Sequence, residues 1–234
     1  MPSGRASDIH HARGGSKSDA SQVIYGKQSV AEAERGRRRV HRVWRAPETS
    51  ADELERLCGS PDHQGVVAEV DPYPYADPAQ LLRVEGALLV ALDQVQDPRN
   101  LGAVARSAEA AGAAGLVVPE RRSAEVTPVA CKASAGAVEH LPIGRVRNLA
   151  DWLGEAKAAG FWIWGADAEA DQAPWEADLT GPTVLVLGGE GKGLRPRVAS
   201  ACDGLLALPQ RGRVGSLNVS AAATALLFEA LRQR

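Results

Sequence analysis

The chain has 234 residues, of which 44% are hydrophobic and 24% are charged, a composition typical of folded globular proteins and unlike that of disordered, highly charged chains. Its net charge of -2 argues against a protein that is basic over its whole surface. No apolar run approaches the roughly 18 residues of a membrane-spanning helix, and no signal-peptide pattern is present, so we expect a cytoplasmic protein with no membrane partner. The three widely spaced cysteines fit neither a disulfide framework nor a zinc site. We therefore expect reduced thiols and no metal.

The charge is distributed unevenly along the chain. Residues 1–45 contain ten basic and four acidic residues, a balance of +6, whereas the remainder carries -8. Arginine supplies most of the positive charge, and its guanidinium group suits phosphate contacts and base stacking. The basic N-terminal portion is therefore either a phosphate-binding region or a solvated tail.

Residues 1–22 are rich in Ser, Gly, Arg and His without apolar periodicity, which predicts a disordered basic tail. A small α/β region is expected over residues 23–80. Its predicted elements are helices near 29–37 and 51–58 and strands near 40–44 and 65–70. Three prolines between residues 71 and 78 predict a linker at its end.

The second region, residues 86–234, opens with the apolar run 87–93, as expected of a strand buried on both faces of a parallel sheet. Further strands are predicted near 115–118, 161–164, 183–188 and 205–208, between helices near 101–111, 128–137, 149–159, 194–201 and 217–232. Strands that alternate with helices predict an α/β domain with a mainly parallel sheet. The last helix should bury one apolar side, formed by Leu217, Ala221, Ala225, Phe228 and Leu231.

Three motifs point to a ligand site. The first, residues 93–106, follows the first strand of the second region, where ligands bind in open α/β sheets. It contains Asn100 and Arg106, which could instead be a helix cap and a surface residue. The second, residues 184–194, is a strand that runs into a glycine cluster; it matches neither the P-loop nor the dinucleotide fingerprint, which leaves a close backbone approach to another ligand or a plain glycine-rich turn.

The third motif, residues 208–223, spans a strand end and the start of the last helix. Ser216 is a suitable N-cap for that helix. Asn218 and Ser220 would then lie inside the helix, where both residue types are mildly unfavourable. Their presence there indicates a site.

Taken together, the order and spacing of the three motifs resemble the SpoU (TrmH) family of RNA ribose 2′-O-methyltransferases in the SPOUT superfamily. The stretches 121–124, 132–139 and 226–234 are similar to the branch that methylates guanosine in bacterial 23S ribosomal RNA (RlmB-type). Residues 23–26 and 63–68 are similar to the start and end of the L30e-like substrate-binding lobe of that branch, although residues 46–62 are shorter than the corresponding family stretch.

The resemblance implies a C-terminal trefoil-knotted methyltransferase domain over residues 86–234, after a shortened L30e-like lobe. It also implies a homodimer with its active site near the subunit interface, S-adenosylmethionine as cofactor, and ribosomal or other structured RNA, and not DNA, as partner. The implied cofactor-binding residues are Gly188, Leu208 and Leu217. The implied catalytic residues are Asn100, Arg106, Glu190, Ser216 and Asn218.

Several questions stay open within this interpretation. Arg106 could activate the ribose hydroxyl, or it could position the neighbouring RNA phosphate, because a guanidinium group does not give up its proton in proteins. Glu190 could orient Asn100 or a partner-subunit arginine, or it could be only an exposed acid in a turn. The substrate could also be transfer RNA, and an inactive RNA- or ribosome-binding relative is the alternative from another class. Retention of Asn100, Arg106, Glu190 and Asn218 favours an active enzyme.

Overall fold

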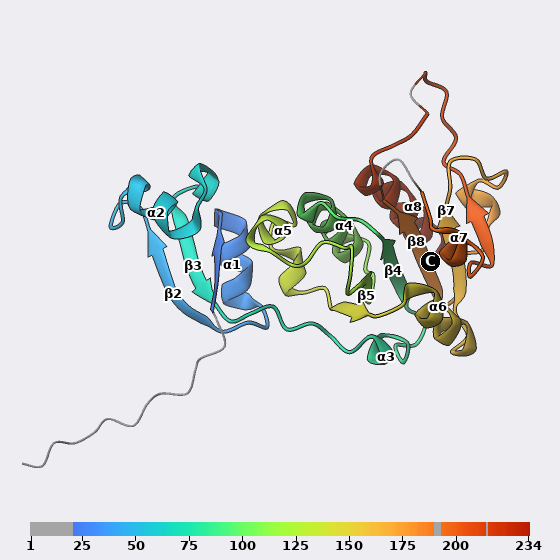
Figure 1. Cartoon of the computed structure of the whole chain (residues 1–234), viewed down its shortest axis with the longest axis horizontal. Coiled ribbons are helices and arrows are strands. Elements are labelled where there is room, and N and C mark those ends of the chain that lie inside the picture. The colour runs from blue at the N-terminus through green and yellow to red at the C-terminus, as the bar shows by residue number, and fades with distance from the viewer. Residues whose placement is uncertain (1–20, 190–192, 214) are drawn as a thin grey trace, which may run out of the picture.

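The computed structural model describes residues 21–189, 193–213 and 215–234. These residues form a small lobe with a three-stranded antiparallel sheet and a larger domain with a six-stranded parallel sheet. Figure 1 shows the lobe at one end of the molecule, beside α5 (Pro128–Ala133), and the larger domain extending from there. The expected α/β class with a parallel C-terminal sheet is therefore confirmed.

In the lobe, the central strand β3 lies between β1 and β2. The lobe elements are β1 (Gln22–Tyr25), α1 (Lys27–Arg35), β2 (Val40–Arg45), α2 (Ala51–Cys58), η1 (Pro61–His63) and β3 (Val66–Val70). Local sequence explains the bounds of α2, because Ser50 accepts a hydrogen bond from the Glu53 amide and Gly59 ends the helix in the left-handed region at φ 68°. Strand β1 begins at Gln22, so the end of the predicted tail, residues 1–22, overlaps this strand. Residues 1–20 of the predicted tail lie outside the described residues.

The strands of the larger domain are ordered β6-β5-β4-β8-β7-β9, and every neighbouring pair is parallel. They are β4 (Leu88–Asp93), β5 (Gly115–Pro119), β6 (Ile143–Val146), β7 (Trp162–Ala166), β8 (Thr183–Gly188) and β9 (Gly204–Leu206). The helices are α3 (Pro78–Leu81), α4 (Pro98–Ala110), α5, η2 (Ala137–Glu139), α6 (Leu149–Ala158), η3 (Pro174–Glu176), α7 (Pro196–Ala199) and α8 (Val219–Gln233). All six carboxyl ends consequently meet at one edge of the sheet.

The core of this domain lies on both faces of the sheet. Strand β4 is buried along its whole length, and its side chains alternate between two apolar clusters, with Leu88 and Val90 in one and Leu89 and Ala91 in the other. The first cluster includes side chains of α4, α5 and α8, and the second includes side chains of α6 and α7. The sheet is therefore the middle layer between helices, as its continuous apolar strands require.

The lobe packs directly against the larger domain. Arg38 forms a buried ion pair with Glu139 of η2, with Nε 2.9 Å from Oε2. Arg37 donates to the backbone oxygens of Glu139 and Leu141 at 3.1 and 3.0 Å, and the Tyr73 hydroxyl donates to the Val138 oxygen at 3.0 Å. One apolar cluster also continues from the lobe into the larger domain. The proline-rich segment thus connects two units that are already in contact.

None of the helices that the structure describes combines the length and apolar character needed to cross a bilayer. Within the same residues, His, Cys, Asp and Glu side chains form no group of three or more that could hold a metal ion. The three cysteines are free thiols. Burial raises the pKa of Cys131 to about 11 and that of Cys202 to about 12, which keeps both thiols protonated and unreactive near neutral pH.

Candidate active site and cofactor cavity

A cavity of about 730 Å³ opens at the carboxyl edge of the sheet, beside the start of α8. Its wall is formed by the ends of β7, β8 and β9 and by the segment that leads into α8. Apolar lining comes from Leu187, Leu206, Leu208, Leu217 and Leu226. This is the edge at which open parallel sheets bind ligands.

Glycines shape the part of the wall that follows β8. A Cβ atom on Gly188 would lie 2.1 Å from the carbonyl carbon of Gly193, and one on Gly189 would lie 2.6 Å from the Gln94 oxygen. Gly189 and Gly193 also pair through an isolated antiparallel bridge. The glycine cluster is therefore required by close backbone packing, and Gly188, Gly189 and Gly193 all line the cavity.

A buried ion pair fastens the next residues to the sheet. Asp93, at the end of β4, is fully buried, and its carboxylate accepts hydrogen bonds from the Arg195 amide at 2.9 Å and from Nε at 2.7 Å. Arg195 Nη2 lies 2.6 Å from the same carboxylate. Because Leu194 and Gly193 line the cavity, this contact fixes one side of it. The sequence feature that indicates this contact is an acid, Asp93, at the end of an otherwise apolar strand.

Two asparagines from distant motifs meet beside the cavity. Asn218 Nδ2 donates to Asn100 Oδ1 at 3.1 Å. Asn100 lies in the first turn of α4 and is buried. The alternative that Asn100 caps this helix is wrong, because the cap is Asp97, whose carboxylate accepts from the Arg99 amide at 2.7 Å.

The start of the last helix also differs from the prediction. The cap is Asn218 and not Ser216, because Asn218 Oδ1 accepts from the Ser220 amide at 2.8 Å and α8 begins at Val219. Asn218 therefore lies before the helix. The inference that Asn218 marks a site because asparagine is unfavourable inside a helix was wrong for this residue. Because only the Oδ1 atom of Asn218 is used for capping, its Nδ2 atom can donate to Asn100. Asn218 therefore both caps α8 and contacts Asn100.

The structure brings most of the predicted site residues together. Gly188, Leu208, Leu217, Ser216 and Asn218 line the cavity, and Asn100 reaches it through Asn218. Arg106 lies about two turns into α4, is exposed, and is not among the described residues that line the cavity. Glu190 lies outside the described residues.

The sequence did not indicate two acids that also line the cavity. Asp167 and Glu169 follow β7, and the Asp167 carboxylate accepts a hydrogen bond from the Glu169 amide at 2.9 Å. No recognisable motif surrounds these two acids. The sequence feature that could have identified them is their position directly after a strand of the parallel sheet. Two carboxylates beside an apolar wall favour a ligand that is partly apolar and carries positive charge.

Comparison with known proteins agrees with this geometry. The model of the SpoU rRNA methylase family matches residues 87–228, and that of the RNA 2′-O ribose methyltransferase substrate-binding domain matches residues 45–76. The chain is 40% identical to an uncharacterized tRNA/rRNA methyltransferase of Mycolicibacterium smegmatis, over 98% of this chain and 82% of that protein. It is 48% identical to the 23S rRNA (guanosine-2′-O-)-methyltransferase RlmB of Pseudomonas syringae, over 74% of this chain and 71% of that protein.

The fold comparison extends over both units. The SpoU methyltransferase AviRb of Streptomyces viridochromogenes, solved in complex with AdoMet, superposes with a TM-score of 0.78 and 30% identity, over 91% of this chain and 90% of that one. The family match alone covers more than half of the sequence. The chain therefore belongs to the SpoU family of RNA 2′-O-ribose methyltransferases, with the substrate-binding domain of that family at its N-terminal side.

Proposed function

We propose that this protein transfers a methyl group from S-adenosylmethionine to the ribose 2′-hydroxyl of a guanosine in 23S ribosomal RNA. The single observation that carries the proposal is the glycine-walled cavity, with the Asn100 and Asn218 side chains hydrogen-bonded at its edge. Family membership supports the reaction class. The relative named as a 23S rRNA guanosine methyltransferase supports ribosomal RNA, whereas relatives named tRNA/rRNA methyltransferases keep transfer RNA as the second candidate.

The residues around the cavity fit this cofactor. Leucine side chains offer an apolar surface to an adenine ring, and Asp167 and Glu169 offer carboxylates to the positive charges of the sulfonium and ammonium groups. Gly188, Leu208 and Leu217 would hold the cofactor, largely through backbone groups. When bound, the cofactor supplies an electrophilic methyl group. AviRb was solved with AdoMet, which supports the same assignment here.

The chain's own task is to place the ribose hydroxyl and to help it lose a proton as it attacks. The hydrogen bond from Asn218 to Asn100 fixes the orientation of both amides at the cavity edge. Such positioning of reacting groups lowers a barrier by roughly 7–11 kcal/mol in well-oriented systems. We assign Asn100, Ser216 and Asn218 to the ribose side of the site and leave Arg106 the role of binding the adjacent phosphate.

Arg106 and the uncovered side of α8 support a homodimer. The side of α8 that was expected to pack stays exposed within this chain, with Phe228 46% and Leu231 44% accessible. Ser107, next to Arg106, shares a 2.7 Å hydrogen bond with Thr224 of α8. A second copy that covers this apolar face would therefore lie close to Arg106, which supports a position of Arg106 near the proposed subunit interface. Burial of such a face is the ordinary driving force of association.

The test is transfer of labelled methyl groups to ribosomal and transfer RNA from cells that lack the gene, followed by mapping of the modified nucleotide. Methylation of a guanosine ribose in 23S RNA is the expected result. Labelling of transfer RNA alone would move the substrate to the second candidate. An Arg106→Ala variant should bind the cofactor but transfer no methyl group. Failure of the wild-type protein to bind S-adenosylmethionine would favour an inactive RNA-binding relative.

A further inference from the structure

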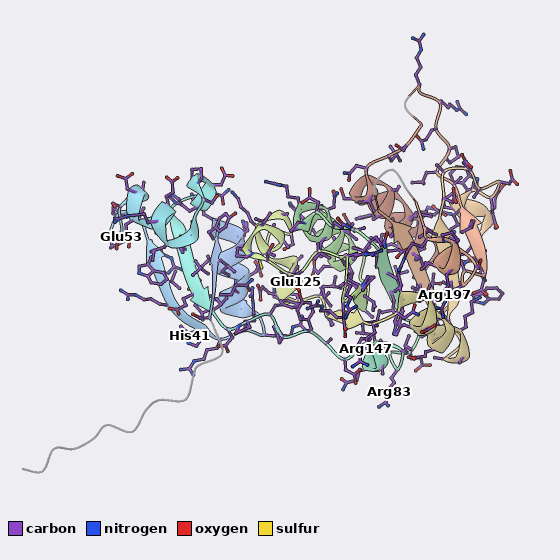
Figure 2. All side chains as sticks on the ribbon, in the orientation of Figure 1. His41, Glu53, Arg83, Glu125, Arg147 and Arg197 are labelled. Carbon is purple, nitrogen blue, oxygen red and sulfur yellow. The ribbon has the colours of Figure 1, made fainter. Side chains whose placement is uncertain are left out.

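Four exposed arginines follow three neighbouring strands at the carboxyl edge of the sheet. Arg99 is the second residue of α4, which follows β4; Arg121 and Arg122 follow β5, and Arg147 follows β6. We call these four residues the arginine rim. Arg121, Arg122 and Arg147 lie outside the three sequence motifs, whereas Arg99 lies within the first of them. Arg147 is labelled in Figure 2.

Backbone hydrogen bonds hold the three rim segments side by side. The Ala124 amide donates to the Val95 oxygen at 2.8 Å, which joins the segment after β5 to the segment after β4. The Glu120 amide donates to the Val146 oxygen at 2.8 Å, which places Arg121 beside Arg147. The rim is therefore a continuous feature of the sheet edge and not a set of unrelated surface side chains.

The positive charge of the rim is not neutralised within the described residues. Some other arginines of this domain are paired with acids: Arg195 with Asp93, Arg197 with Asp151 and Arg145 with Glu125. Among the residues that the structure describes, none forms an ion pair or side-chain hydrogen bond with the four rim guanidinium groups. Three exposed acids, Asp97, Glu120 and Glu125, lie in the same segments, and Glu125 is paired with Arg145 outside the rim. The four rim arginines therefore outnumber the acids around them.

The rim also connects the cavity with the lobe. Arg99 precedes Asn100, which is bonded to the cavity residue Asn218. At the other side, the Val126 oxygen, four residues after Arg122, accepts a hydrogen bond at 3.0 Å from the Gln22 side chain of β1. A strand of RNA that ran along the rim would therefore pass from the methylation site toward the substrate-binding lobe.

We propose that the arginine rim binds the phosphate backbone of the RNA substrate between the methylated nucleotide and the lobe. The proposal rests on RNA being the substrate, as argued above. Exposed guanidinium groups form paired, charge-assisted hydrogen bonds with phosphate oxygens. Such contacts fix the register of the RNA without reading its bases, so the rim contributes affinity and position while the sequence is selected elsewhere.

The experiment compares an Arg121→Gln/Arg122→Gln double variant and an Arg147→Gln variant with wild type. Arg83→Gln is the matched control, because Arg83 is exposed and lies five residues before β4, on the amino-terminal side of that strand. Equilibrium binding of a 23S ribosomal RNA transcript is measured over a series of salt concentrations, without turnover. Calorimetry with S-adenosylmethionine checks that each variant keeps its cofactor site.

The double variant should bind the transcript roughly tenfold more weakly at 50 mM salt, and its log-log salt slope should fall by about two. Arg147→Gln should lower the slope by about one, and Arg83→Gln should match wild type. Unchanged affinity and slope in the rim variants, or an equal loss in Arg83→Gln, would overturn the proposal. Wild-type protein that binds RNA but methylates none would instead overturn the proposed activity, so the two failures are distinguishable.

Discussion

Replacement of Asp93 by Asn tests whether the buried ion pair sets both the stability and the cofactor site. The substitution keeps the shape of the side chain and removes its charge. Three donors of Arg195 now point at this carboxylate, one from the backbone and two from the guanidinium group. An amide can accept fewer of them, and its own NH₂ group must face a cation.

The expected cost follows from the geometry. Each hydrogen bond to a charged group contributes about 1.5–3 kcal/mol, and loss of one partner of a fully buried pair costs about 3–5 kcal/mol. The Arg195 side chain is 42% exposed, so water can replace part of the lost contact. We therefore expect a loss of about 2–3 kcal/mol in the free energy of unfolding, which lowers the Tm by about 4–12 °C for a chain of this size.

The matched control is Asp151→Asn, which removes the partner of Arg197. That pair is short, at 2.5 Å, but its side chains are 58% and 72% exposed, and exposed pairs contribute about 0–1 kcal/mol. Urea unfolding followed by tryptophan fluorescence gives the free energies, and calorimetry gives the affinity for S-adenosylmethionine. Asp93→Asn should lower both quantities, because the Arg195 contact fixes the segment that contains Gly193 and Leu194.

Equal stability of the two variants would refute this reasoning, since it would mean that burial adds nothing to the Asp93 contact. A large loss of stability with wild-type cofactor affinity would separate the two effects. In that case the ion pair would hold the fold without shaping the cavity.

Three further outcomes are expected. Gly188→Ala should weaken cofactor binding by about tenfold or more in calorimetry, because its Cβ would overlap Gly193; unchanged affinity would show that the glycine wall can move. Phe228→Asp should convert a dimer to a monomer in sedimentation experiments, and a wild-type monomer would contradict the homodimer. Arg38→Met should destabilise the protein by about 3–5 kcal/mol by leaving Glu139 buried without its partner, and addition of Glu139→Leu should restore most of the loss in urea unfolding.

Strong local patterns were sufficient to predict much of this fold from the sequence. Strand β4 was predicted because six consecutive buried positions produce a continuous apolar run. Strand β6 was missed because it has only four residues, Ile143–Val146, of which two are Gly144 and Arg145. Short strands with polar residues take their structure from neighbouring strands, and a pattern within the segment does not reveal it.

The candidate site was predictable where a residue's role depends on its position in a motif. Asn100, Asn218 and Gly188 were identified in this way, and the structure places them at one edge of the sheet. Asp167 was not identified, because it becomes part of the cavity only when β7 is placed beside β8. The trefoil knot stays a prediction, as do the roles of Glu190 and Arg106.

Net charge was the least informative property, because arginines in this protein perform two different tasks. Arg37 and Arg38 belong to the basic N-terminal segment that seemed suited to RNA, yet both are used to fasten the lobe to η2. The excess charge of residues 1–45 is therefore not all available to phosphates. Arg121 and Arg147 belong to the acidic remainder of the chain, yet both are exposed and outside any ion pair among the described residues. A contact with RNA depends on which guanidinium groups remain free after folding, and only the tertiary structure determines that.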